Sequence, residues 1–320
     1  MRNLFLLSFL FLLSCQKIYQ DKFVFCGTYV RVISPHKEAA KIAQEEFKRL
    51  EKIFNFYDPN SELSLLNSTY NFPFPASSEL IKCIEEAKKV YQLSGGFFDV
   101  GKARLYNFWK DIIKKKRKIK DKDFNFLKKT VDELKRDSFL DIVIDKKNRT
   151  ITLKKKGLKV DLGGIAKGFI IDKVVERLKK KGIKSALIDA GGDIFCLGKY
   201  KGRKWRVGIK DPKNKSRVIY SLSLSNQAVA TSGSYEQFFE FSGRSFSHLI
   251  DPFSGFPVNN NILSVTVVAP SATLADSLAT TFFIMGYEKT KEFIKRHKDL
   301  NIDVFLVLQE DNKEKLYHLK

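Results

Sequence analysis

Residues 160–168, which read VDLGGIAKG, combine side chains that could handle phosphate. The adjacent Gly163 and Gly164 let a ligand approach the backbone, while Asp161 offers a carboxylate and Lys167 a cation one helical turn further on. This combination suits a phosphate-bearing ligand with a divalent ion. The alternative is a tight turn in which Asp161 only caps a helix and Lys167 only meets solvent. The stretch is neither a Gly-Lys-Ser/Thr phosphate loop nor a GxGxxG fingerprint.

Asp276 and Thr280 are a second polar pair, four residues apart on a predicted helix that is otherwise apolar. Residues at this spacing share one helix face, and a carboxylate and a hydroxyl are hard to bury without a partner. Oxygen ligands of this kind suit Mg²⁺, which binds few protein groups and completes its shell with phosphate and water. Alternatively, Thr280 bonds back to its own helix and Asp276 faces solvent.

Three loops add further candidates. Tyr57 stands beside an Asp-Pro turn, where it could stack on a planar ring or simply pack. Asp99 follows two phenylalanines and a Gly-Gly hinge, and packing does not explain its carboxylate. His248 comes just before the turn Asp-Pro-x-Ser-Gly, and binding sites tend to be built on such loops.

The remaining pattern supplies the elements that must position these residues. Gly157 to Val160 alternates like a half-buried strand and leads into a helix from Ile165 to Lys181, closed by Gly182. Further helices are predicted over 36–54, 78–93, 271–286 and 287–297, with a polar helical region over 104–136. Strand-like patterns occur at 23–33 (interrupted at 26–28), 139–144, 150–153, 185–189, 205–210, 219–224, 227–231, 263–268 and 302–309. Together they indicate a mixed or antiparallel sheet packed with helices.

Length and composition allow a substantial core. The chain has 320 residues, of which 43% are hydrophobic, and no Pro-, Gly- or Ser-rich linker divides residues 23–320, so we expect one domain there. The net charge of +22 favours anionic partners such as nucleic acid, nucleotide or an acidic membrane surface. Lysine is also spread along the whole chain, as the codon usage of an AT-rich genome would produce.

The N-terminus carries an export signal. Arg2 precedes the apolar run Leu4 to Leu13, and the sequence LLSC ends at Cys15. This pattern predicts a lipoprotein signal peptide over 1–14, lipidation of Cys15 and a short tether over 15–22, with an ordinary signal peptide as the alternative. Either way the body is exported to the extracytoplasmic or periplasmic side, where the lipid would hold it to a membrane. The other cysteines form no CxxC pair and no zinc spacing.

Five stretches occur in an order that resembles a known family: DLGGIAKG at 161–168, DAGGD at 189–193, ATSG at 230–233, SHLIDP at 247–252 with Gly255, and ADSLAT at 275–280. They resemble the bacterial FAD:protein FMN transferases, the ApbE family of flavin transferases, over nearly the whole mature chain. The resemblance implies an α+β fold. It also implies Mg²⁺-dependent transfer of FMN from FAD to a threonine or serine of an acceptor protein, with AMP as the leaving group.

The resemblance also assigns residues. It implies FAD contacts at Cys26, Tyr57, Phe97, Phe98, Asp99, Asp161, Lys167 and Ile250, and places Mg²⁺ on the Gly164 carbonyl, Asp276 and Thr280. Asp161 or His248 would accept the proton of the acceptor hydroxyl, and Lys167 would stabilise developing charge. Two positions depart from the family pattern, since Cys26 stands where methionine is common and Ser234 where aspartate is frequent.

Two other functions use the same residues. Water in place of a protein hydroxyl would give a FAD pyrophosphatase that yields FMN and AMP, and a protein without turnover would be a flavin-binding lipoprotein. No RNA- or DNA-binding module is visible, so nucleic acid is not an expected partner despite the charge. The chain contains no Ser-Gly-Ala-Thr type target, so the acceptor is expected to be another protein.

Overall fold

The computed structural model describes residues 17–114, 124–214, 216–233, 238–241, 244–247, 249–311 and 313–320. The predicted signal peptide, Cys15, Ser234 and the candidate catalytic residue His248 lie outside these ranges. The predicted tether, 15–22, overlaps the first strand, which begins at Tyr19.

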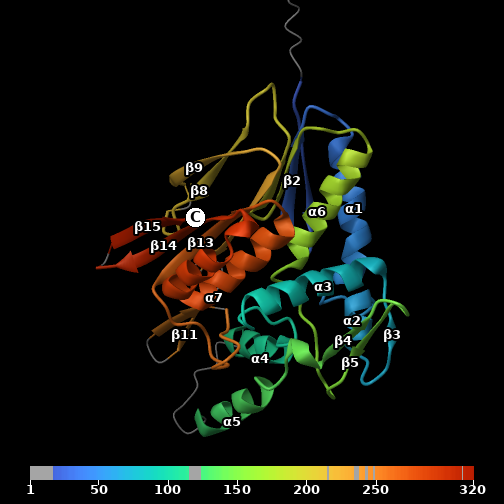
Figure 1. Ribbon diagram of the computed structural model, residues 1–320, viewed down its shortest axis with the longest axis vertical. Coiled ribbons are helices and arrows are strands. Elements are labelled where there is room, and N and C mark those ends of the chain that lie inside the picture. The colour runs from blue at the N-terminus through green and yellow to red at the C-terminus, as the bar shows by residue number, and fades with distance from the viewer. Residues whose placement is uncertain are drawn as a thin grey trace, which may run out of the picture.

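An antiparallel sheet forms the centre of the described structure (Figure 1). Every neighbouring pair in it is antiparallel, which confirms the α+β prediction. Among the described residues its eight strands are, in spatial order, β1 (Tyr19–Phe25), β2 (Thr28–Ser34), β6 (Ala186–Ala190), β7 (Asp193–Leu197), β10 (Gln227–Gly233), β13 (Ile262–Ala269), β14 (Asp303–Glu310) and β15 (Lys313–Leu319).

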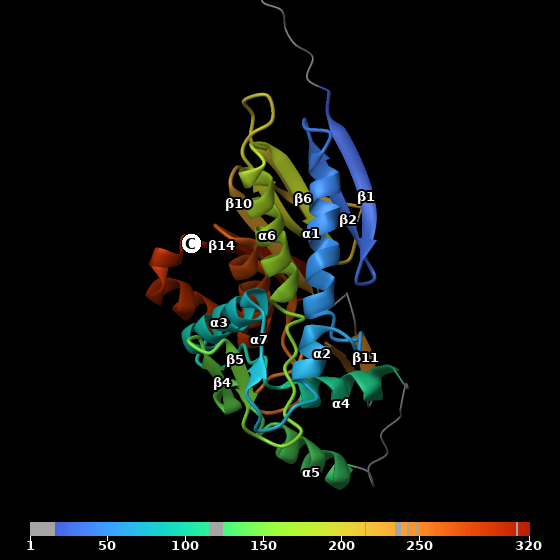
Figure 2. The same cartoon turned by 90° about the vertical axis from the view of Figure 1, so that its right-hand side faces the viewer.

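The two faces of this sheet are covered differently. The face that carries Val30, Ile188 and Val267 joins the main core with helices α1 (Ala39–Phe54), α6 (Ala166–Lys180) and α7 (Ala272–Arg296). The other face packs on the hairpin of β8 (Trp205–Lys210) and β9 (Val218–Leu224). Side chains alternate across a strand, so Leu187 and Ile188 belong to different cores. Figure 2 shows α1 and α6 lying side by side along the sheet.

Helices α6 and α7 are held in close contact at one point. A Cβ on Gly168 would lie 2.2 Å from the Ala272 carbonyl oxygen, so only glycine permits this crossing. One turn along α6, the Asp172 carboxylate accepts hydrogen bonds from the Ala272 and Thr273 N–H groups, each at 2.8 Å. These N–H groups are among those that a helix leaves unsatisfied at its start. The contact fixes the helix that follows the glycine turn against the helix that carries Asp276.

A smaller region adjoins the end of α1. Its elements are α2 (Glu62–Leu66), α3 (Ser78–Leu93), α4 (Ala103–Lys114), α5 (Phe124–Leu134) and a sheet of β3 (Phe74–Pro75), β5 (Thr150–Leu153) and β4 (Ile142–Asp145). The Trp109 indole N–H donates to the Gly255 carbonyl at 2.7 Å and so ties α4 to the loop after the hairpin of β11 (Phe238–Phe241) and β12 (Arg244–Ser247).

Besides the tether, two predicted elements differ from the structure, and some strands, β7 and β15 among them, were not predicted. Residues 157–160 form no strand apart from one bridge between Lys159 and Lys102, because the Asn67 side chain bonds both the N–H and the carbonyl of Val160. The two helices predicted over 271–297 are the single element α7, in which Gly286 (φ 82°) breaks the helical backbone. Strand β15 was not predicted, since it is a lysine-rich strand at the edge of the sheet. Among the described residues no helix is both long and apolar enough to span a bilayer.

Candidate active site

A cavity of about 460 Å³ lies where α6, α7, α4 and the strand ends of the main sheet meet. Its volume falls in the range of small-molecule sites. It gathers ten of the residues predicted from the sequence: Tyr57, Phe97, Phe98, Asp99, Asp161, Gly164, Lys167, Ile250, Asp276 and Thr280. Cys26 is not among the lining residues.

The glycine turn and the polar face of α7 meet inside this cavity. A Cβ on Gly164 would lie 3.5 Å from the Thr280 hydroxyl and 3.2 Å from a ring carbon of Phe98, so the backbone is close to both. The Gly168 N–H donates to Asp276 Oδ2 at 3.0 Å, although these residues are more than a hundred positions apart in the chain. Asp276 is only 6% exposed, which excludes the alternative in which it faces solvent.

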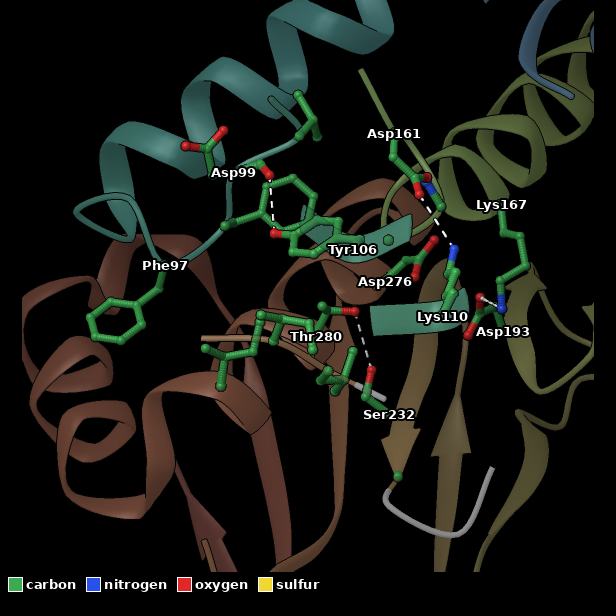
Figure 3. A pocket seen from close by; sticks show the side chains of 18 of the residues that line it. Phe97, Asp99, Tyr106, Lys110, Asp161, Lys167, Asp193, Ser232, Asp276 and Thr280 are labelled. Carbon is green, nitrogen blue, oxygen red and sulfur yellow. Dashed lines mark hydrogen bonds and ion pairs between the residues drawn. The ribbon is translucent and has the colours of Figure 1, made fainter. Parts of the chain in front are cut away.

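Thr280 is linked to the sheet as well as to the turn. Its hydroxyl lies 3.3 Å from the Ser232 hydroxyl at the end of β10, as Figure 3 shows. The neighbouring Thr231 hydroxyl lies 2.8 Å from that of Thr266 on β13. Strand β10 thus presents hydroxyl groups to the cavity beside α7. Both residues belong to the motif ATSG, but hydroxyl side chains in a predicted strand carry no signal that assigns them a role.

Lys167 is positioned by a buried carboxylate. Its Nζ lies 2.8 Å from Asp193 Oδ2, and the Asp193 side chain is 5% exposed (Figure 3). Asp193 belongs to the second glycine turn, at the start of β7. Because its partner is buried, the lysine is held toward the cavity rather than released to solvent, which excludes a purely solvated Lys167.

Lys110 is a second cation in the cavity and was not predicted. Its Nζ lies 3.5 Å from Asp161 Oδ2 and 3.4 Å from the Tyr57 hydroxyl. Burial would lower the pKa of Lys110, but Asp161 and Tyr57 outweigh that effect and raise it, so the lysine is charged at neutral pH. No sequence signal marks it, because a lysine on a polar helix is ordinary until the fold places it beside Asp161.

Asp161 bridges the turn and this lysine. Its Oδ1 accepts a hydrogen bond from the Gly163 N–H at 2.8 Å while Oδ2 faces Lys110. The carboxylate therefore keeps the glycine turn in shape and also lies at the cavity wall, but it does not cap α6, whose N-cap residue is Ile165 with no side-chain cap hydrogen bond.

Aromatic side chains form the entrance. The Phe97 ring packs edge-on against Phe253 with centroids 4.8 Å apart, and Lys289 Nζ lies 4.5 Å from the Phe97 centroid. Tyr57 is 70% exposed, whereas Phe98 is buried deeper in the wall. An open aromatic edge of this kind suits a planar ring.

Asp99 lines the cavity, but its carboxylate is engaged with the backbone. Oδ1 accepts hydrogen bonds from the Gly101 and Phe139 N–H groups, both at 2.8 Å. Burial raises the pKa of Asp99, although these hydrogen bonds and Lys102 oppose the rise. The Tyr106 hydroxyl donates to the Asp99 carbonyl at 3.1 Å. These contacts explain the carboxylate by local structure, and its contact with FAD stays a prediction.

Cys26 occupies the turn between β1 and β2 with a φ of 44°. Its thiol lies 3.5 Å from a Glu51 carboxylate oxygen. The neighbouring Thr28 is tightly packed on the second glycine turn, because a Cβ on Gly191 would lie 2.4 Å from the Thr28 hydroxyl. Cys26 is therefore two residues from a side chain that packs on the turn leading to Asp193, and its contact with FAD stays a prediction.

The oxygen groups around Gly164 fit a magnesium ion. They include one buried carboxylate, one hydroxyl and a backbone that glycine allows to approach Thr280. Within the described ranges no group of three or more His, Cys, Asp or Glu side chains could hold a metal. An ion bound here would thus have few protein ligands, as magnesium commonly does.

Comparison with known proteins identifies the family. The sequence model described as "ApbE family" matches residues 26–306, which is most of the chain. The chain belongs to the ApbE family. This confirms the resemblance seen in the five motifs.

Curated relatives of this ApbE family chain are FAD:protein FMN transferases. The protein of that name from Vibrio cholerae is 30% identical over 292 residues, covering 87% of this chain and 83% of the relative. The one from Haemophilus influenzae is 29% identical over 265 residues, covering 80% and 74%. The one from Treponema pallidum is 43% identical over 151 residues, and the match spans less than half of either protein, 44% and 42%.

Solved structures show the same fold. The ApbE protein of Thermotoga maritima aligns with a TM-score of 0.83 at 28% identity, covering 95% of this chain and 97% of that one. The flavin transferase ApbE of Vibrio cholerae aligns with a TM-score of 0.81 at 26% identity and the same coverage.

Proposed function

We propose that this protein transfers FMN from FAD to a threonine or serine hydroxyl of an acceptor protein, in a magnesium-dependent reaction that releases AMP. The observation that carries the proposal is the meeting of Gly164, Asp276 and Thr280 with two lysines in one aromatic-edged cavity. Its relatives of similar length are named FAD:protein FMN transferases.

FAD would lie across the cavity. The isoalloxazine ring would pack against Phe97 and Tyr57, and the pyrophosphate would lie between Lys167 and Lys110. Both lysines are already held by carboxylates, so little side-chain freedom is lost when the ligand binds. Positioning of this kind accounts for much of the rate enhancement in phosphoryl transfer.

The Gly164 carbonyl, Asp276 and Thr280 would hold the magnesium ion. When bound, the ion supplies positive charge to the pyrophosphate oxygens. The Gly168 N–H keeps the Asp276 carboxylate turned toward the site, and Ser232 lies beside the Thr280 hydroxyl.

The reaction replaces the phosphoanhydride bond of FAD with a phosphoester bond to the acceptor. The acceptor hydroxyl oxygen forms a bond to the FMN-side phosphorus, and the bond from that phosphorus to the bridging oxygen breaks, so AMP leaves with that oxygen. The hydroxyl proton passes to Asp161, whose carboxylate lines the cavity, or to His248. Lys167 and Lys110 stabilise the negative charge that develops on the phosphate oxygens.

Hydrolysis of FAD is the alternative, since water could replace the acceptor hydroxyl. The test is to incubate the purified protein with FAD, Mg²⁺ and a candidate acceptor domain, and to measure AMP, flavin fluorescence in a denaturing gel and acceptor mass. Transfer predicts an acceptor heavier by FMN less one water and an equal amount of AMP. AMP and free FMN without labelling would identify a hydrolase, and bound FAD without AMP would identify a flavin-binding protein.

The proposal extends to the place of action. A signal peptide over 1–14 and a lipid on Cys15 would hold the protein at a membrane on the extracytoplasmic side, where its acceptor would be an exported or membrane protein. Mass spectrometry of the mature N-terminus tests this, and an unmodified Cys15 or an intact Met1 would contradict it.

A further inference from the structure

Four segments come together at one end of the molecule. Strand register places them there, because Tyr19 pairs with Ser34, Ile33 with Leu187 and Ala186 with Leu197. The segments are residues 17–19, 34–38, 179–185 and 198–204. The Ser34 hydroxyl donates to the Ser185 carbonyl at 2.7 Å, and a Cβ on Gly198 would meet the Lys184 carbonyl.

These segments are strongly basic. They carry ten exposed lysines and arginines, and Glu38 is their only acidic residue. We call this surface the basic end, and its cations are Lys17, Lys37, Lys179, Lys180, Lys181, Lys184, Lys199, Lys201, Arg203 and Lys204. Across the whole chain basic residues outnumber acidic ones by only 58 to 36, so codon usage alone does not account for a ratio of ten to one.

The cations of the basic end have no carboxylate partners among the described residues, although Lys17 and Lys201 lie over the rings of Tyr19 and Tyr200. Within the part of the chain that the structure describes, none of the ten lies within 4 Å of a carboxylate. Arg177, one turn before them on α6, instead pairs with Glu45 and Glu46. The charge of the basic end is therefore available to an outside partner.

The start of the described chain points to the nature of that partner. Lys17 belongs to the basic end and is two residues after Cys15, a separation of at most about 7 Å. The residues before it include the apolar run Leu4 to Leu13. If Cys15 is acylated, or if this run is retained, the basic end is the described surface that adjoins the membrane-bound segment. A bilayer surface that contains anionic lipids attracts lysines and arginines that lie beside it.

We propose that the basic end is the membrane-facing surface of this protein and binds the headgroups of anionic phospholipids. Helix α6 runs from the cavity, at Lys167, to the basic end, at Lys180 (Figure 2). Its 15 residues span about 22 Å, so the docked fold holds its cavity about that far from the lipid surface. This orientation deepens the proposed function, because it restricts the acceptor sites to those at that height.

Vesicle binding tests the proposal. The chain of residues 15–320 carrying Cys15→Ser, which has neither the acyl group nor the apolar run Leu4 to Leu13, is sedimented with vesicles of phosphatidylcholine alone or mixed with phosphatidylglycerol, at low and physiological salt. We expect binding that requires phosphatidylglycerol and weakens with salt. The variant K180E/K181E/K199E/K201E should weaken it about tenfold or more.

A matched control separates location from net charge. The variant K128E/K129E/K147E/K156E changes the same charge on α5 and near β4 and β5, where all four lysines are exposed, and should bind vesicles nearly as the parent does. Equal losses in both variants, or equal binding to neutral vesicles, would overturn the proposal. Stronger binding of the parent to duplex DNA than to anionic vesicles would identify nucleic acid as the partner and also overturn it.

The outcome is independent of the flavin reaction. Both variants should retain parental melting temperature and parental labelling of a soluble acceptor, because all eight lysines lie away from the cavity lining. Loss of labelling in every protein, with vesicle binding intact, would refute the proposed function alone.

Discussion

The two ends of helix α6 use lysine in opposite ways. At its start Lys167 is 2.8 Å from the buried Asp193 carboxylate, and Gly168 packs so closely on Ala272 that a Cβ would not fit. At its end Lys179 and Lys180 are exposed, and neither has a described carboxylate within 4 Å. Lysine is thus held by a buried carboxylate at the start of the helix and has no ion pair of this kind at its end.

This difference corresponds to the kind of anion that each end of the helix is proposed to bind. A pyrophosphate has a defined shape, so cations held by carboxylates are preorganised for it. A lipid surface is diffuse, and flexible exposed cations are sufficient to bind it. The start of α6 should therefore be sensitive to single substitutions, whereas its end should respond only when several charges change together.

The largest single effect should come from Asp276. Asp276→Ala removes a buried carboxylate near Gly164 and should lower the rate of FMN transfer by about 10²- to 10³-fold, because the proposed metal site would lose its anionic ligand. Acceptor labelling at several Mg²⁺ concentrations measures the loss.

Asp276→Asn is the matched control. It keeps an oxygen that can accept the Gly168 N–H and so should preserve the melting temperature, but it removes the charge and should still lose most activity. Parental turnover in either variant would refute the metal assignment.

A smaller effect separates the two lysines of the cavity. Lys167→Met should reduce kcat/KM for FAD about 10²-fold, whereas Lys110→Met should reduce it about tenfold, since Lys110 meets its carboxylate at 3.5 Å rather than 2.8 Å. Steady-state kinetics with varied FAD gives both values.

The double variant Lys167→Met/Asp193→Asn distinguishes catalysis from stability. It removes the buried carboxylate that Lys167→Met leaves without its cation, and should regain melting temperature but not activity. If kcat/KM for FAD fell further in Lys110→Met than in Lys167→Met, Lys110 and not Lys167 would be the more important cation for the reaction.

The smallest effect concerns Glu46, the buried carboxylate that pairs with Arg177 near the end of α6. Burial would raise the pKa of Glu46, but hydrogen bonds and charge from Arg49 and Arg177 outweigh it and lower the pKa. A lowered folded-state pKa contributes stability above the unfolded value, about 4.3, and that contribution is lost as pH falls through the folded value.

Glu46→Gln should therefore lower the melting temperature by a few degrees at neutral pH, and the difference from wild type should shrink as the pH falls below about 4. Glu45→Gln, which removes a more exposed carboxylate from the same arginine, should change it less. A Glu46→Gln deficit that stays constant down to acid pH would contradict the linkage.

The α+β class was predictable because most elements carry their own signal. Helix α6 was expected over 165–181 and spans Ala166–Lys180, since its apolar spacing and the closing Gly182 are local features. The expected strand at 157–160 failed because its hydrogen-bond partner is the Asn67 side chain, more than ninety residues away. The periodicity of a short segment cannot show that a distant side chain takes the place of a neighbouring strand.

The candidate site was predictable to a similar depth. Asp161, Lys167, Asp276 and Thr280 stand out because a polar side chain in an apolar setting needs a partner, and the structure brings them to one cavity. Lys110 and Asp193 were missed as site residues because a lysine on a polar helix and an aspartate in a turn are unremarkable until the fold pairs them with Asp161 and Lys167.

The break at Gly286 divides α7 into two helical segments. The first carries Asp276 and Thr280 in the cavity lining, and the second carries Lys289, which lies over the Phe97 ring at the entrance. Because the φ of 82° interrupts the helical backbone, a substitution in the second segment does not shift the first through a continuous helix. The entrance can therefore change during evolution to suit a new acceptor while the residues that line the cavity keep their positions.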